Sequence, residues 1–297
     1  MPIRLDAVQA EDKAFIISGH FIRTAALKNE WQEDIENPRA LIRELKVSAA
    51  RVDLLRFWQR IPESEPKYSY YHEWQDVATI PISDYKHWFE KQITRSARNK
   101  VRKSTKFGVF IEQSELTDDL VRAIMGVFNQ SPVRRGKPFW HYGKDFETVK
   151  KDMSLDLDES IFVTAYYTGE LIGFVKLFFA DRYALLTVIL DKSNHRDKAP
   201  MNGLIAKSVE ICEARKVPYL VYYMWRRAGH RDFQESMGFE RIPIPEYFVP
   251  LSLKGRMALR LGLHRGVRGL VPEKALTWLL RCRARWYVAK YSLQPAE

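Results

Sequence analysis

The chain has 297 residues, a length that fits two modest domains or one large one. Its hydrophobic fraction of 46% and its charged fraction of 29% are those of globular proteins, which excludes disordered and fibrous classes. Only Cys212 and Cys282 are present, so the sequence predicts no disulfide framework and favours a reducing, cytosolic compartment. We expect no secretory signal at the start and no membrane-spanning helix, because no run approaches ~18 apolar residues.

The net charge of +11 is concentrated in two segments. Residues 91–106 contain seven Lys or Arg and no acid, and residues 251–297 contain ten Lys or Arg against two Glu. Two basic segments on a mildly acidic body predict a polyanionic partner, namely nucleic acid, anionic lipid or a phosphorylated ligand. The alternative is that this charge only keeps the protein soluble.

The first part of the chain is predicted to form short strands around one helix. Residues 37–51 predict the helix, with Asn37 as its N-cap and Pro38 at its first position. Apolar, aromatic and β-branched runs predict strands over residues 14–18, 21–28, 52–60 and 68–80.

A long basic helix follows over residues 83–104, with Ser83 as its predicted cap. Ile93, Ala97 and Val101 recur at every fourth position, so we expect them to form one buried stripe and to leave most of the cations outward.

The second part of the chain has clearer patterns. The continuous apolar run over 184–190 predicts a strand that is buried on both faces. Helices are predicted over residues 116–131, 145–154, 201–216 and 230–239. The other predicted strands cover residues 107–112, 161–167, 171–179, 217–225 and 242–252.

The order of these elements over residues 107–252 resembles that of a GNAT acyltransferase domain. The resemblance is carried by the hairpin IFVTAYYTGELIGFVKLFF, the strand ALLTVIL, the loop and helix DKSNHRDKAPMNGLIAKSVEICEARKV and the strand PYLVYYMW. RNKVRKSTKFGVFIE and FQESMGF resemble segments of FemAB-like peptidyltransferases, which consist of two tandem GNAT-type halves and use aminoacyl-tRNA.

This resemblance implies an α+β fold with a mixed, mostly antiparallel sheet flanked by helices. It implies a degenerate GNAT-like half over residues 1–104, an acyltransferase domain over 105–252 and a basic amphipathic helical tail over 253–297.

A GNAT domain holds its donor at the loop after the central strand, where backbone amides and a helix N-terminus bind a pyrophosphate or phosphopantetheine arm. The family pattern [Q/R]-x-x-G-x-[G/A] falls on residues 196–201, where Ala199 and Met201 replace the small residues and Pro200 has no N–H. This alteration favours the FemAB-like branch or a donor other than CoA. An ordinary helix-starting turn is the alternative. The donor-binding residues that the resemblance implies are His195, Arg196, Lys198, Ala199, Met201, Asn202 and Gly203.

Acylation of an amine needs a base for the incoming ammonium and an acid for the leaving group. The tyrosine that often serves as this acid in GNAT enzymes is replaced here by Gln234, which cannot supply a proton. The candidates that replace it are Tyr222, Tyr223, His230 and Asp191, which the predicted fold brings to one end of the sheet. For each of them alone, a packing or surface role is the favoured interpretation.

The loop over residues 131–145 is the predicted acceptor site, because cations that can meet carboxylate or phosphate alternate there with rings that can stack on a sugar or base. A solvated connector is the alternative. The predicted acceptor-binding residues are Arg134, Arg135, Lys137, Trp140, His141, Tyr142 and Lys144.

The C-terminal tail has the composition of a helix that lies on an anionic membrane. A tRNA-contacting appendage and a helix packed on the core are the alternatives. One predicted face contains Leu276, Leu279, Leu280 and Tyr287, with Lys274, Arg281 and Arg285 beside it.

Two functions from different classes follow. The first is an acyl or aminoacyl transferase that uses acyl-CoA or aminoacyl-tRNA and needs no metal, expected in the cytoplasm or peripherally at the inner face of the membrane. Its acceptor would be an amine or hydroxyl of a small molecule or of a glycan- or lipid-linked, cell-envelope or polysaccharide-type compound. The second is a GNAT-like scaffold that has lost its chemistry and binds RNA or an anionic membrane surface. The sequence supports no zinc site, Ser-His-Asp triad or P-loop.

Overall fold

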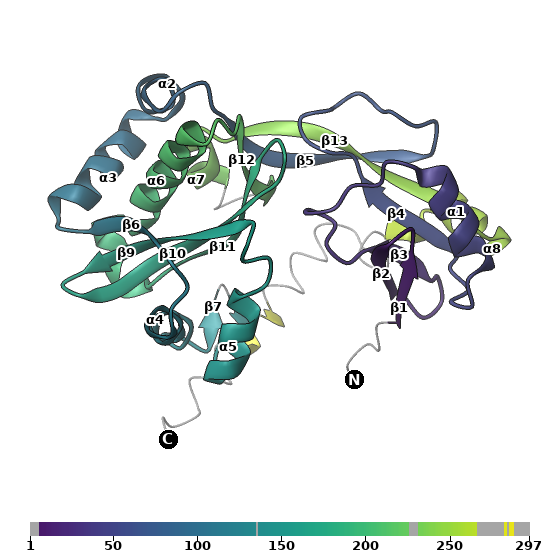
Figure 1. Ribbon diagram of the computed structural model, residues 1–297, viewed down its shortest axis with the longest axis horizontal. Helices are drawn as coiled ribbons and strands as arrows, with labels where there is room; N and C mark the ends of the chain where they lie inside the picture. Colours follow the sequence, from purple (N-terminus) through teal and green to yellow (C-terminus); the bar gives the residue numbers. More distant parts are fainter. Residues whose placement is uncertain (1–5, 135, 226–230, 266–281, 284, 288–297) are drawn as a thin grey trace. The chain divides into compact units, whose positions relative to one another are not determined.

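The computed structural model describes the chain apart from residues 1–5, 135, 226–230, 266–281, 284 and 288–297, and it divides into two compact units (Figure 1). One unit contains residues 1–76 and 242–279, and the other contains residues 77–241 and 280–297. The predicted domain boundaries after residues 104 and 252 divide the sequence between two GNAT-like halves, and they stay a prediction.

The sheet of the first unit has the strand order β1-β2-β3-β4-β13. Only β3 and β4 are parallel, because α1 (Pro38–Val47) connects them, and the other pairs are antiparallel. The side chain of Asn37 accepts from the N–H of Ala40, so the predicted cap is confirmed. The strands are β1 (Asp6–Ala10), β2 (Lys13–Ser18), β3 (Thr24–Leu27), β4 (Leu54–Trp58) and β13 (Glu240–Pro250).

The sheet of the second unit has the strand order β5-β12-β11-β10-β9-β6. Here β11 and β12 are the parallel pair, with α6 (Pro200–Ala214) between them in the chain, and the other pairs are antiparallel. The strands are β5 (His72–Pro81), β6 (Phe110–Ser114), β9 (Ser160–Tyr167), β10 (Glu170–Phe179), β11 (Ala184–Asp191) and β12 (Tyr219–Met224).

The two units repeat one topology. Each has three antiparallel strands, a helix, a fourth strand parallel to the third, and a fifth strand antiparallel to the fourth. The fifth strand of each unit comes from the other half of the chain, because β13 completes the first unit and β5 completes the second. The predicted fold class, an α+β fold with a mostly antiparallel sheet in two similar halves, is confirmed.

Helices cover both faces of the second sheet, with α3 and α6 on one face and α4 and α5 on the other (Figure 1). Leu204, Ile205, Val209 and Cys212 of α6 are all buried. The remaining elements of this unit are α2 (Tyr85–His87), a π-helix (Trp88–Gln92), α3 (Arg95–Lys106), α4 (Asp118–Phe128), β7 (Val133–Arg134), β8 (Lys137–Pro138), α5 (Phe146–Met153), a 3₁₀-helix (Ser193–Lys198) and α7 (Arg231–Ser236).

The helix predicted over residues 83–104 is broken, and Ser83 does not cap it. The side chain of Asp84 caps α2, and that of Thr94 starts α3 by accepting from the N–H of Ala97 at 3.2 Å. The break arises because the N–H of Thr94 donates to the carbonyl of Ser236, which draws this residue out of the helix. The predicted stripe of Ile93, Ala97 and Val101 is nevertheless buried.

The basic tail begins as α8 (Leu253–Arg260), and a 3₁₀ turn (Leu263–Arg265) follows. The apolar face predicted at Leu276, Leu279 and Leu280 lies outside the described residues. None of the described helices is long and apolar enough to cross a membrane.

Candidate functional site

The central strands of the second unit separate at the two tyrosines of β12. β11 pairs with β12 over only two residues, and Leu185 opposite Val221 is the last pair. On its other side, β12 carries a bulge, because Val221 and Met224 pair with β5 residues that are only two positions apart. Tyr223, inside this bulge, has φ +46°, a conformation that bulky residues rarely adopt. A bulge re-aims side chains, so both tyrosines can reach one cavity.

The separation leaves the end of β11 uncovered. Residues 184–186 are buried, but residues 187–190 are only half-buried, so the prediction of a strand buried on both faces is wrong for its second half. The run stays apolar there because it forms the wall of two cavities rather than the centre of a core.

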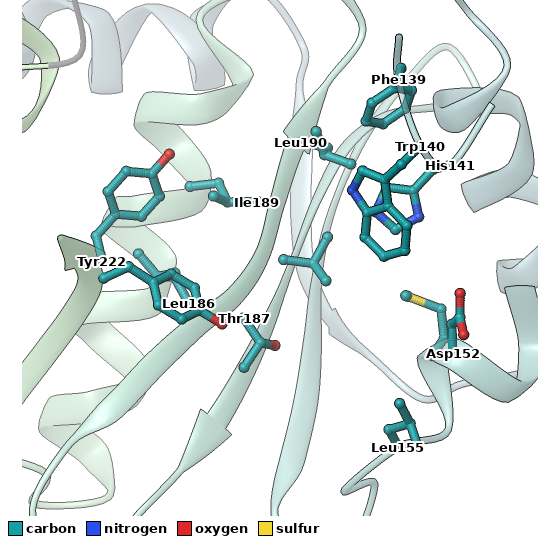
Figure 2. Close-up of a pocket in the computed structure, with 13 residues that line it drawn as sticks. Phe139, Trp140, His141, Asp152, Leu155, Leu186, Thr187, Ile189, Leu190 and Tyr222 are labelled. Atoms are coloured by element: carbon teal, nitrogen blue, oxygen red, sulfur yellow. The ribbon is translucent and has the colours of Figure 1, made fainter. Parts of the chain in front are cut away.

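The two cavities lie along this exposed part of β11. The larger has a volume of about 940 Å³ and the smaller of about 440 Å³. In Figure 2, Tyr222 lies on one side of the smaller cavity and Trp140 and His141 on the other, with Ile189 and Leu190 of β11 between them. The residues that line both cavities are Phe139, Trp140, Ile189, Leu190 and Tyr222.

The larger cavity is lined by three cations, Arg134, Lys137 and Arg196. Arg134 Nη2 donates to the main-chain carbonyl of Asp191 at 3.0 Å, and its guanidinium lies 4.7 Å from the ring centroid of Phe139. Arg196 Nε lies 3.4 Å from the Asp191 carboxylate. Asp191 therefore positions two of these cations at the end of β11.

The N-terminus of α6 also opens into the larger cavity. Ala199 has φ +55°, the left-handed conformation that favours the glycine of the GNAT pattern. The amides of Asn202 and Gly203 both donate to the carbonyl of Ala199, and Pro200 has no N–H. Among the described residues, the amide of Met201 is thus the one in this turn with no partner, and it is available for an anion.

Two predicted donor residues of the same helix have packing roles. Asn202 Nδ2 lies 3.0 Å from the sulfur of Met237, although Asn202 also lines the larger cavity. A Cβ at Gly203 would lie 2.7 Å from the hydroxyl of Ser104, so glycine lets α6 approach α3.

Two other predicted donor residues contact side chains outside both cavities. His195 Nε2 lies 3.2 Å from the carboxylate of Glu170, and the ammonium of Lys198 lies 4.7 Å from the ring centroid of Tyr167. Neither residue lines a cavity.

The acceptor loop contributes the rings of Trp140 and His141 to the smaller cavity, but the charge of Lys144 beside them is neutralised by an ion pair. Lys144 Nζ lies 2.6 Å from the carboxylate of Asp152 and 3.9 Å from the ring centroid of Trp140. Tyr142 is 47% exposed and lines neither cavity. Arg135 and His230 lie outside the described residues.

His141 is held neutral. Its imidazole is buried, with ring centroids 4.0 Å from Phe128 and 3.6 Å from Trp140. Burial, and then the charge of Lys144, lower the pKa of His141 to about 4. Its Nδ1 is buried and has no hydrogen-bond partner among the described residues.

The two tyrosines are the candidates for proton transfer at the strand gap. Burial raises the pKa of Tyr223 to about 12, so this phenol stays protonated and can donate a hydrogen bond. Tyr222 is half-buried and lines both cavities. Gln234 is fully buried and lines neither cavity.

Sequence reasoning missed two polar residues that line the smaller cavity, Asp152 and Thr187. Thr187 is the single polar residue of the apolar run over 184–190, and that interruption was a usable signal. Nothing in the sequence indicates that Asp152 meets Lys144. Among the described residues, no group of His, Cys, Asp or Glu side chains is arranged to hold a metal ion.

A buried lysine supports one wall of the smaller cavity. Lys176 is 4% exposed, and its ammonium donates to the carbonyls of Met153, at 3.0 Å, and Leu155. Burial lowers the pKa of Lys176. Lys176→Met leaves both carbonyls without this donor, so we expect a loss of about 1–3 kcal/mol in the free energy of unfolding. Urea unfolding measures it, with Lys151→Met on the exposed side of α5 as the control; equal losses in both variants would contradict the prediction.

Comparison with protein-family models and with curated protein sequences gives no match. Solved structures are similar. The C-terminal domain of a protein assigned as a lysylphosphatidylglycerol synthetase from Agrobacterium fabrum matches with a TM-score of 0.59, 12% identity and 86% coverage of each chain. FemX matches with a TM-score of 0.55 and 11% identity, covering 83% of this chain and 88% of FemX. L-PGS from Bacillus licheniformis also gives 0.55 and 11%, covering 82% of this chain and 83% of that one.

The chain has a FemAB-like, GNAT-type fold. The repeated topology of the two units agrees with this fold.

Proposed function

We propose that the protein is an acyl or aminoacyl transferase that works at the gap between β11 and β12. The observation that carries this proposal is the pair of cavities that share Tyr222 and Trp140 at the gap. One cavity can hold a donor and the other an acceptor, with the reacting atoms meeting between them. Proximity of this kind is a large part of what an acyl-transfer catalyst supplies.

The donor is assigned to the larger cavity. This cavity is the cationic one, because it is lined by Arg134, Lys137, Arg196, the Met201 amide and the N-terminus of α6. Such a lining suits the phosphates of acyl-CoA or of the 3′ end of aminoacyl-tRNA. One similar structure belongs to a protein assigned as a lysylphosphatidylglycerol synthetase, which supports an aminoacyl donor.

The acceptor is assigned to the smaller cavity. Its wall is mostly apolar, and its charged residue Asp152 is paired with Lys144. This chamber suits an amine or hydroxyl on a cell-envelope or polysaccharide-type compound whose neighbouring part is apolar.

The transfer step needs two proton movements. The acceptor nitrogen or oxygen attacks the carbonyl carbon of the donor, the bond from that carbon to sulfur or ribose oxygen breaks, and the proton that the acceptor loses is relayed through the phenol of Tyr222 to the leaving group. We assign to Tyr222 the transfer of a proton to the leaving group, and to Tyr223 the donation of a hydrogen bond to the carbonyl oxygen. Asp191 acts by positioning Arg134 and Arg196 for the donor. His141 acts as a neutral ring that helps to orient the acceptor.

An aminoacyl-tRNA donor would also use the basic helix α3. Arg95, Lys100 and Lys106 are exposed, and no described carboxylate pairs with them. The same feature supports the second candidate function, an RNA-binding scaffold without chemistry.

Ligand-induced stabilisation tests the donor site. Acetyl-CoA or aminoacyl-tRNA should raise the thermal midpoint of the wild-type protein by mass action. Lys137→Gln combined with Arg196→Gln should remove most of that shift, because both cations line the larger cavity. The matched control, Lys100→Gln with Lys106→Gln on α3, should keep the shift from acetyl-CoA.

The chemistry is tested separately with Tyr222→Phe. This variant should keep the donor-induced shift but lose donor cleavage in the presence of a panel of amines, by about 10²-fold or more. No shift with either donor class would contradict the proposal. A salt-sensitive shift with uncharged as well as aminoacylated tRNA, without cleavage, would favour the scaffold.

A further inference from the structure

Helix α8 of the first unit has an exposed apolar stripe. Leu253, Met257 and Leu261 recur at every fourth position and are 73%, 61% and 63% exposed. Large apolar side chains that gather on a surface mark an interaction site more often than single exposed ones do.

The orientation of α8 is fixed, so this stripe cannot turn inward. The hydroxyl of Ser252 caps the helix by accepting from the N–H of Gly255 at 3.0 Å and donates to the carboxylate of Asp53 at 2.7 Å. Gly255 packs so closely that an added Cβ would collide with the main-chain carbonyl of Asp53. Ala258, on the same inner side, is buried.

A fourth exposed apolar side chain contacts α8 through Lys254. Phe21 is 73% exposed, and the ammonium of Lys254 lies 4.5 Å from its ring centroid. Lys254 directly follows Leu253, so this contact brings the ring to the first turn of α8.

Cations border the stripe, and α8 contains no acid. Arg256 and Arg260 are exposed, and neither pairs with a carboxylate of the described residues. Lys254 lies 3.7 Å from the carboxylate of Asp53. The unpaired arginines therefore favour a partner with negative charge, and the stripe favours a partner that also has an apolar region.

We propose that α8 and Phe21 form a docking surface for a bilayer that contains anionic phospholipid. Such a bilayer offers both components, since its headgroups attract the arginines and its acyl boundary accepts Leu253, Met257 and Leu261. Nucleic acid has no comparable apolar boundary for aliphatic side chains. This docking does not depend on the transfer chemistry, and it would bring the first unit to the membrane surface.

Vesicle flotation of the full chain tests the proposal. We expect binding to phosphatidylcholine vesicles that contain phosphatidylglycerol and little binding to phosphatidylcholine alone. Changing Leu253, Met257 and Leu261 together to Gln should lower the partition coefficient at least tenfold. Arg256→Gln with Arg260→Gln should lower it by about fivefold per cation, and high salt should weaken wild-type binding. The control is Val47→Gln with Leu157→Gln, two exposed apolar residues elsewhere, which should leave binding unchanged.

A fluorescent label separates insertion from charge attraction. Cys282 is exposed, so an environment-sensitive dye is placed at Met257→Cys in a Cys282→Ser background, with Val47→Cys as the matched position. Anionic vesicles should shift the emission to the blue only at position 257. Absence of binding, binding that the triple variant keeps, or equal emission at both positions would overturn the proposal. If the molar mass of the triple variant in solution without vesicles differs from that of the wild type, the stripe mediates contact between two copies of the chain, and the proposal is overturned.

Discussion

Acidification from pH 7.5 to 4.5 is expected to destabilise the second unit by about 2.5 kcal/mol through the imidazole of His141. The pKa of this group is lowered from 6.5 to about 4 in the folded chain, so the unfolded chain binds its proton first. Stability is therefore complete above pH 6.5 and is lost as the pH falls toward 4. His141→Phe keeps a ring between Phe128 and Trp140 and should remove this part of the pH dependence.

Urea unfolding at both pH values, in wild type and in His141→Phe, measures the effect. Glu246 acts oppositely, because burial raises its pKa to about 6 and its contribution falls by about 2 kcal/mol as the pH rises from 4.5 through 6. Wild type and His141→Phe share the Glu246 contribution, so it cancels when their free energies of unfolding are subtracted. The remaining pH dependence belongs to His141. His87→Gln, at an exposed histidine, should retain the wild-type dependence. An unchanged slope in His141→Phe would contradict the prediction.

Trp88→Ala should cost about 3–5 kcal/mol of the free energy of unfolding, the largest effect that we expect from one side chain. Trp88 is fully buried in the π-helix, and its Nε1–H donates to the carbonyl of Met237 at 3.0 Å. The same ring limits the space at Gly238, which has φ +78° and where a Cβ would lie 3.3 Å from Nε1. The truncation opens a cavity and leaves the carbonyl without its donor.

Trp88→Phe separates these two losses. It keeps most of the ring volume but not the hydrogen bond, so we expect about 1–3 kcal/mol. Chemical denaturation followed by circular dichroism gives both values. Equal costs for the Phe and Ala variants would show that packing contributes little here.

The sequence pattern correctly predicted the features that depend only on nearby residues. The stripe of Ile93, Ala97 and Val101 is buried, and the cap at Asn37 is in place. The break before Thr94 escaped the pattern because its cause is a hydrogen bond to Ser236, far away in the sequence.

The candidate site shows a similar limit. An alternating pattern places Tyr222 and Tyr223 on opposite faces of a strand, and only the bulge brings both to the smaller cavity. The composition of the acceptor loop predicted several free cations, but Lys144 is paired with Asp152. Composition states which charges exist, whereas long-range pairing decides which remain available to a ligand.

The exchange of fifth strands between the two halves affects how the protein is made. The first four strands of the first unit end at Trp58, but their fifth neighbour, β13, starts at Glu240. At ~5–20 residues per second, a ribosome needs roughly 10–40 seconds to synthesise the chain between them. During that time β4 has an unpaired edge, which is open to association with other chains. The usual order, in which an N-terminal domain folds before the next one is translated, is therefore closed to this protein, and the sheet of its first unit is completed after that of the second.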